Sequence, residues 1–202
     1  MIDKNNILSS LGNKKNVVVE LGCGQHKHIQ EAIGVDILDN ENVDIIADVN
    51  QGLGFFQDNS IDLIYSSHFL EHVQDLGFVL KEIHRVLKPG GKVTGLVPHF
   101  SNPYYYSDYT HITPFGLYSF SYFSKNHYFK RKVPVFYNEL DFKINSIKVI
   151  FYSPFRFLNI FRKIYTIIFN SSLLLLEWYE AFWCKILPAH EIKFELEKKA
   201  KD

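Results

Sequence analysis

The sequence predicts an α/β fold: a Rossmann-like, doubly wound sheet that is mostly parallel, with an antiparallel last strand and a C-terminal helical insert. Short runs of β-branched residues, such as Val17–Val19, are typical of buried parallel strands. A Gly-x-Gly pair at Gly22 and Gly24 follows that run, and two later runs end in Asp36 and Asp48. Because the carboxyl ends of parallel strands meet at one edge of a sheet, these residues predict a ligand site there.

Five parallel strands are expected from these runs. They are Val17–Leu21, Ile33–Asp36, Val43–Asp48, Ile61–Tyr65 and Lys92–Val97. An apolar stripe at helical spacing predicts a helix over Phe69–Leu87, which Pro89-Gly90-Gly91 ends. The segment between the glycine loop and Ile33 is short for a full crossover helix, so one helical turn or a bare loop is expected.

The ordered motifs E-L-G-C-G, V-D-I, I-A-D-V-N, N-S-I-D-L-I-Y-S-S-H-F-L-E-H-V and L-K-E-I-H-R-V-L-K-P-G-G-K resemble those of class I S-adenosylmethionine-dependent methyltransferases, and the type 11 branch is the closest match. The resemblance covers residues 16–123 and implies S-adenosyl-L-methionine as cofactor, with S-adenosyl-L-homocysteine as product. It assigns the methionine end of the cofactor to the glycine loop, its ribose to Asp36 and its adenine to Asp48. The implied cofactor-binding set is Glu20, Gly22, Cys23, Gly24, Asp36, Ile37, Asp48, Val49, Ser67 and His68.

Composition excludes some partners and sets the expected location. The 202 residues are expected to form a single methyltransferase domain, residues 1–202. The formal net charge is zero, from 22 basic and 22 acidic residues, so no nucleic-acid partner is expected. Two cysteines do not make a disulfide framework, and the N-terminus lacks a signal-peptide pattern, so a cytoplasmic location is expected.

The stretch His68-Phe69-Leu70-Glu71-His72 matches the H-x-x-E-H pattern of some zinc peptidases. A catalytic zinc site would need a third protein ligand from elsewhere in the chain. The same residues follow directly after the fourth expected strand, where the resembled family lines its methyl-donor pocket. We therefore expect no metal, and we expect Glu71 and His72 to orient the helix start and form the pocket wall.

A long Tyr-rich loop leaves the carboxyl end of the fifth strand, and residues 99–134 are expected to form a lid on the acceptor side. We expect His111 to act as general base, oriented by Asp108 or by a neighbouring backbone group, with His99 as second choice. The alternative is that His111 only shapes the lid. Cations between Lys125 and Lys132 are either a solvated face or a site for a phosphate-bearing acceptor.

Residues 155–187 are expected to form a helical insert between a strand at Phe142–Tyr152 and a last strand at Glu191–Lys198. The insert carries an apolar stripe, which predicts that it packs on the sheet or in a homodimer. The residues of the stripe are Phe157, Leu158, Phe161, Ile164, Tyr165 and Ile168. The alternative is peripheral contact with a membrane or a lipid-linked acceptor. Neither apolar piece has the roughly 20 residues that a transmembrane helix needs.

The function that these features indicate is methyl transfer from S-adenosylmethionine to a small-molecule or glycan acceptor, at oxygen. Two alternatives stay open. One is a lipid or quinone methyltransferase that docks at a membrane surface, and the other is a non-catalytic S-adenosylmethionine-binding protein.

Overall fold

The computed structural model describes residues 1–13, 15–155, 157 and 159–200. Within them, eight strands form one sheet in the order β1-β4-β3-β2-β5-β6-β8-β7. Their bounds are Ile2–Asp3 (β1), Val18–Leu21 (β2), Ile33–Asp36 (β3), Ile45–Ile46 (β4), Ile61–Ser67 (β5), Leu87–Pro98 (β6), Phe142–Ile150 (β7) and Glu191–Lys198 (β8). β4, β3, β2, β5 and β6 run parallel, whereas β8 is antiparallel to both β6 and β7. The predicted fold class is confirmed, and β1 adds an antiparallel edge strand.

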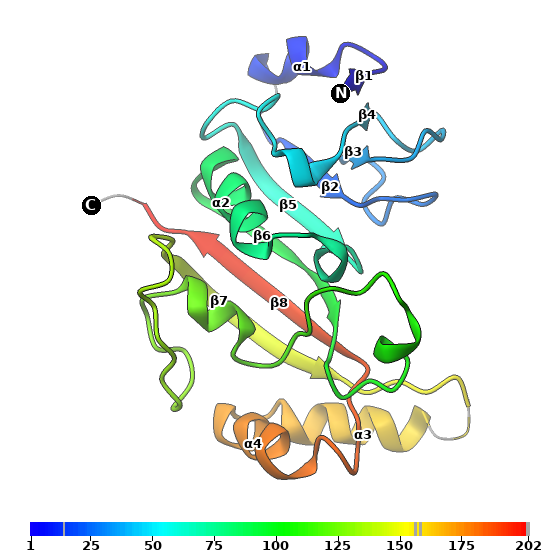
Figure 1. Cartoon of the computed structure of the whole chain (residues 1–202), viewed down its shortest axis with the longest axis vertical. Coiled ribbons are helices and arrows are strands. Elements are labelled where there is room, and N and C mark those ends of the chain that lie inside the picture. Colours follow the sequence, from blue (N-terminus) through cyan, green and yellow to red (C-terminus); the bar gives the residue numbers. More distant parts are fainter. Residues whose placement is uncertain (14, 156, 158, 201–202) are drawn as a thin grey trace.

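β2 is the central strand, and Val19 and Leu21 on it are fully buried. The chain runs from β2 to β3 and β4 on one side, then returns to β5 and β6 on the other (Figure 1). This reversal of strand order opens a crevice at the carboxyl ends of β2 and β5, which is where open α/β sheets bind ligands.

The third strand is shorter than expected. Val43–Asp48 was predicted, but β4 covers only Ile45–Ile46. Val43 closes a turn onto the carbonyl of Asn40, and Asp48 caps a short 3-10 turn by accepting a hydrogen bond from the Asn50 amide. Both side chains therefore belong to the connections rather than to the ladder. The sixth strand also ends early, at Ile150 rather than Tyr152, and the fifth begins at Leu87 rather than Lys92.

The prediction of one helix over Phe69–Leu87 was wrong for its first part. Helix α2 spans Leu76–Val86, and Leu70–His72 form a separate 3-10 turn. Val73 has extended backbone, and the Asp75 carboxylate caps α2 by accepting the Phe78 amide at 2.9 Å. The apolar stripe continues through this break because both pieces pack on the same core.

Between β2 and β3 the chain makes turns instead of a helix, as expected. A short helix α1, Ile7–Ser10, precedes β2. The helical insert is confirmed as α3, Asn159–Phe169, and α4, Leu173–Trp178, which continues as a single π-helical turn over Tyr179–Trp183. In Figure 1 these helices lie side by side beyond the β7–β8 end of the sheet. Leu158 of the predicted stripe lies outside the described residues.

Most of the predicted apolar stripe is not packed on the sheet, so that expectation was wrong for every described member except Tyr165, which packs against the core. Phe161 is 56% exposed and Ile164 46% exposed. The side of α3 that meets the sheet is instead built on Thr166, Phe169 and Asn170, because Thr166 and Asn170 satisfy backbone groups at the end of β7.

Candidate active site at the carboxyl ends of the parallel strands

A cavity of about 310 Å³ lies at the carboxyl ends of β2, β3, β4 and β5. Its lining residues are Gly22, Asp36, Ile37, Ala47, Asp48, Val49, Asn50, His68, Phe69, His72 and Val73. The structure therefore brings together six predicted cofactor residues: Gly22, Asp36, Ile37, Asp48, Val49 and His68. The other four, Glu20, Cys23, Gly24 and Ser67, are not among the lining residues.

Glu20 holds the glycine loop in place from inside. Its carboxylate is 1% exposed and accepts hydrogen bonds from the amides of His28 and Ile29, each at 3.0 Å. The His28 ring also lies 2.9 Å from the same carboxylate. These contacts fix a connection that has no crossover helix, so Glu20 shapes the loop.

Gly22 and Asp36 lie at the carboxyl ends of β2 and β3. Gly22 has φ +68°, and a Cβ there would lie 2.5 Å from the ring of Phe69. Only glycine combines this backbone with so close a neighbour. Asp36 accepts the amide of Gly24 on one carboxylate oxygen, at 2.8 Å, and the amide of Leu38 on the other, at 2.9 Å. The acid is thereby held at the rim of the cavity.

Cys23 is a buried free thiol within this loop. Burial, with the nearby carboxylates of Asp36 and Glu20, raises the pKa of Cys23 to about 12. The thiol stays protonated at neutral pH, so it packs in the loop and supplies no nucleophile.

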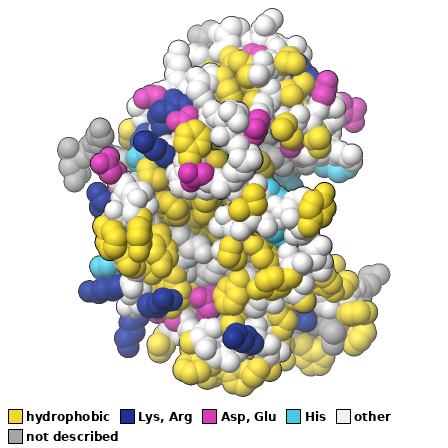
Figure 2. All heavy atoms as spheres, in the orientation of Figure 1, with side chains coloured by type: hydrophobic (Ala, Val, Ile, Leu, Met, Phe, Trp, Pro, Cys, Tyr) yellow, Lys and Arg dark blue, Asp and Glu magenta, His cyan; other side chains and the backbone are white. Residues whose placement is uncertain are grey.

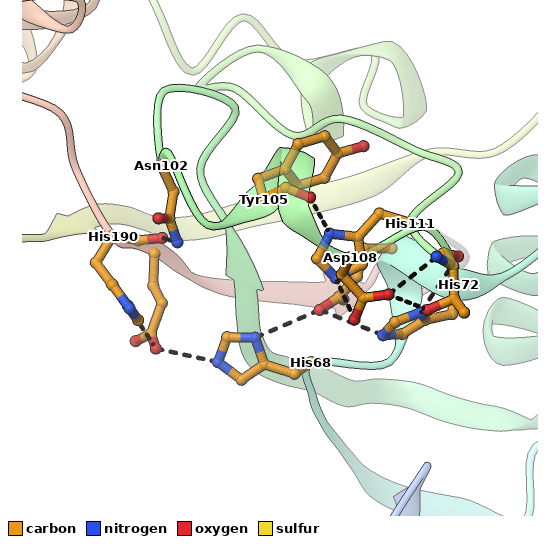
Figure 3. Close-up of polar contacts among 10 residues, drawn as sticks. His68, His72, Asn102, Tyr105, Asp108, His111 and His190 are labelled. Carbon is orange, nitrogen blue, oxygen red and sulfur yellow. Dashed lines mark hydrogen bonds and ion pairs between the residues drawn. The ribbon is translucent and has the colours of Figure 1, made fainter.

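His68 forms a charged bridge at the end of β5, drawn in Figure 3. Its Nε2 lies 3.0 Å from the Glu191 carboxylate, and its Nδ1 lies 3.3 Å from Oε1 of Glu71. The hydrogen bond to Glu191, and then the nearby Glu71 carboxylate, raise the pKa of His68 to about 9. Burial alone would raise the pKa of Glu191, but hydrogen bonds from His190 and His68 lower it to about 2.

Glu71 is the functional candidate that sequence reasoning underestimated. Its side chain is fully buried, and within the described residues its carboxylate oxygens accept no well-aligned hydrogen bond. His68 and His72 lie at 3.3 and 4.0 Å. The Glu71 carbonyl accepts the amides of Ile112 and Thr113, which pins segment 99–134 to the end of β5. The sequence signal that could have identified Glu71 is its position beside His72, shortly after the end of β5.

His111 comes from that segment and meets His72. The two rings are 4.8 Å apart, and His111 stacks on Tyr105 at 4.7 Å. Atoms of Glu71, His72 and His111 that could ligate a cation lie within 4.8 Å of one another. This group differs from the zinc-peptidase motif H-x-x-E-H, in which His68 and His72 would both bind the metal. Here His68 pairs with Glu191 instead.

The tautomer of neutral His111 follows from its contacts. Nδ1 lies 2.8 Å from the carbonyl oxygen of Tyr105, which can only accept, so Nδ1 carries the proton. Nε2 then holds the lone pair, 3.6 Å from Asp108. Asp108 mainly accepts hydrogen bonds from Thr110, which lower its pKa. Of the two orienting groups considered, the backbone carbonyl holds the ring.

His99 lies elsewhere. It is 0% exposed, and the Ser101 amide donates to its Nδ1 at 3.0 Å. Its Nε2–H therefore faces the Glu180 carboxylate at 3.3 Å, which links β6 to the helical insert. Neither His99 nor His111 is among the residues that line the cavity, but the ring of His111 contacts His72, which does line it.

Comparisons with known proteins agree with this fold. Residues 19–94 match the type 11 family described as "Methyltransferase domain". A crystal structure of an S-adenosylmethionine-dependent methyltransferase from Archaeoglobus fulgidus superposes with a TM-score of 0.55, at 16% identity, over 96% of this chain and 94% of that one. The match over residues 19–94 confirms the resemblance to the type 11 methyltransferase family, and the Archaeoglobus fulgidus structure shares the fold of this chain.

Two curated relatives match only short stretches. The uncharacterized protein YafE of Escherichia coli is 42% identical over 38 residues, which are 19% of this chain and 18% of that protein. Sterol 4-C-methyltransferase strm-1 of Caenorhabditis elegans is 49% identical over 37 residues, which are 18% of this chain and 11% of that protein. The chain thus spans less than a fifth of each of these relatives.

Proposed function

We propose that this chain transfers the methyl group of S-adenosylmethionine to an oxygen of a small or carbohydrate-like acceptor. The observation that carries the proposal is the cavity at the carboxyl ends of β2–β5, with Gly22, Asp36 and Asp48 on its wall. We assign the methionine end of the cofactor to Gly22 and Gly24, the ribose to Asp36 and the adenine to the surroundings of Asp48, Val49 and Ile37.

Charge supports this assignment. Asp36 and Asp48 line the cavity, and Glu71 and Glu191 flank the cationic His68. The wall is therefore negative overall, whereas S-adenosylmethionine carries a sulfonium and an ammonium against one carboxylate. Opposite net charges favour loading of the donor over its neutral-sulfur product.

The transfer itself is an in-line displacement. The acceptor oxygen forms a bond to the methyl carbon while the carbon–sulfur bond breaks, and its electron pair stays on sulfur, giving neutral S-adenosylhomocysteine. The acceptor proton passes to Nε2 of His111, whose Nδ1–H is held by the Tyr105 carbonyl. Most of the rate enhancement is expected from alignment, which is worth roughly 7–11 kcal/mol in well-oriented reactions.

A label-transfer experiment tests the activity. The protein is incubated with S-adenosylmethionine labelled in the methyl group and with extracts separated into water-soluble glycans and lipids. Label in the glycan pool that survives mild base supports O-methylation of a carbohydrate-like acceptor. Label in the lipid pool instead favours the lipid or quinone alternative, and no label in any pool favours a non-catalytic binding protein.

A further inference from the structure

The insert presents its apolar side to solvent. On α3 the outward residues Phe161, Ile164 and Ile167 are 56%, 46% and 71% exposed. Inward, Asn170 donates to the Val149 carbonyl and accepts the Val149 amide, and Thr166 accepts the amide of Phe151. The polar side of α3 thus satisfies backbone hydrogen-bonding groups at the end of β7. A water-facing helix would have the reverse arrangement.

The same surface continues over α4 and the π-helical turn. Leu174, Trp178, Phe182 and Ile186 are 67%, 43%, 68% and 75% exposed. Figure 2 shows hydrophobic side chains gathered at the end of the molecule where α3 and α4 lie, with Lys and Arg side chains beside them. An apolar surface of this extent on one end of a protein marks an interaction site.

The acidic side chains of the insert face the rest of the protein, and its lysines face solvent. Glu177 points inward, where it accepts the amides of Lys130 and Arg131 and the hydroxyl of Tyr118. Glu180 also points inward, accepting the Leu117 amide at 2.7 Å.

What remains outward on the described part of the insert is cationic. Lys163 and Lys185 are exposed. The exposed Lys130 and Arg131 border a shallow hollow of about 360 Å³, which is also lined by Tyr118, Leu174, Glu177, Trp178, Ala181 and Phe182. Cations therefore rim the apolar face, and the two acids among the described residues 159–187, Glu177 and Glu180, are half-buried and accept backbone amides.

We propose that this face, which we define as the exposed residues of α3, α4 and the π-helical turn with Lys130 and Arg131, docks on the surface of an anionic lipid bilayer. Exposed Ile, Phe and Trp side chains insert at the headgroup boundary, and the lysines and arginine meet lipid phosphates. Within the described residues no helix is long and apolar enough to cross a membrane. Two copies packed through this face would instead bring like charges together.

A series of contacts leads from the insert to the proposed methyl-transfer site. A cavity of about 180 Å³ lies where segment 99–134 meets the insert, lined by Tyr104, Tyr152, Phe155 and His190 among others. His190 pairs with Glu191, which holds His68 at the cofactor cavity. The inference goes beyond the proposed function, and it holds whichever acceptor is methylated.

Vesicle flotation tests the proposal. The full chain is floated with vesicles of phosphatidylcholine alone and with vesicles containing 30% phosphatidylglycerol. The expected result is at least tenfold more bound protein on the anionic vesicles, reduced by 0.5 M NaCl. A protein that stays at the bottom of the gradient with anionic vesicles overturns the proposal.

Two variant pairs separate apolar insertion from charge. Phe161→Asp with Ile167→Asp changes exposed side chains of α3, and Leu38→Asp is the matched control, since Leu38 is 56% exposed at the other end of the sheet. Lys130→Glu with Lys163→Glu is matched by Lys15→Glu. Both double variants should lose at least tenfold in vesicle binding with unchanged melting temperature, and both controls should bind as wild type.

The oligomeric state of the protein in solution distinguishes docking on a bilayer from packing against a second copy of the chain. A monomeric wild-type chain that binds vesicles supports the proposal. A wild-type dimer that Phe161→Asp with Ile167→Asp converts to monomers, with no vesicle binding by either, assigns the face to a second copy and overturns it.

Discussion

The Nδ1 atom of His111 lies 2.8 Å from the carbonyl oxygen of Tyr105, so the proton of the neutral ring is held by backbone rather than by Asp108. If His111 is the general base, His111→Ala should lower the single-turnover rate of methyl transfer about 10²–10⁴-fold at saturating acceptor. Affinity for S-adenosylhomocysteine should not change. A near wild-type rate for His111→Ala would rule out the base assignment and leave His111 as a residue of the lid.

Asp108→Asn provides the comparison. Its carboxylate mainly caps Thr110, so this variant should keep a rate within about tenfold of wild type. His99→Ala removes a buried imidazole that does not line the cavity, and it should reduce stability more than rate. A loss of rate with His99→Ala larger than with His111→Ala would reverse the order of the two candidates.

The glycine loop gives a graded stability prediction. Gly22→Ala should destabilise the fold by about 2–4 kcal/mol, since left-handed backbone costs about 1–2 kcal/mol and the new Cβ meets Phe69. Gly24→Ala, with φ +53° and no neighbour within 4 Å, should cost only about 1–2 kcal/mol. Gly54→Ala has open space and should change stability by less than about 0.5 kcal/mol. Urea unfolding measures all three, and equal costs at Gly22 and Gly24 would contradict the close contact with Phe69.

The His68–Glu191 pair predicts a pH window for stability. The pKa of Glu191 is lowered from 4.5 to about 2, so its contribution is present above pH 4.5 and is lost as the pH falls through about 2. The pKa of His68 is raised from 6.5 to about 9, so its contribution is present below pH 6.5 and is lost as the pH rises through about 9.

Glu191→Gln should therefore destabilise the protein most between about pH 4.5 and 6.5, by about 1–2 kcal/mol. The difference from wild type should shrink above pH 9. Thermal unfolding across the pH range measures it. A difference that is constant from pH 4 to pH 10 would show that the charged bridge does not contribute.

The parts of the fold that local pattern determines were predictable. Ile33–Asp36 and Glu191–Lys198 match their strands, because apolar runs bounded by turns specify them locally. The break before α2 was missed because it depends on the cap at Asp75, whereas hydrophobic spacing alone continues through it.

Long-range relationships were not predictable in the same way. The outward face of α3 was missed because periodicity shows that a helix has an apolar side but not what covers it. Glu71 and Glu191 meet on His68 although 120 residues separate them, and only the pairing of β8 beside β6 brings them together. Four of the six cavity residues, Gly22, Asp36, Ile37 and His68, end a parallel strand or follow one directly. Asp48 and Val49 lie two and three residues past β4, and the family resemblance supplied them.

Calorimetric titration of S-adenosylhomocysteine tests the central claim, that the cavity at the ends of β2–β5 binds the cofactor. Asp36→Ala should lower the affinity at least tenfold, and Asp39→Ala, an exposed acid three residues later, should leave it unchanged. Melting temperatures of both variants serve as the control for folding. Wild-type protein that binds no S-adenosylhomocysteine, or a folded Asp36→Ala that binds as tightly as wild type, would contradict the assignment of this cavity.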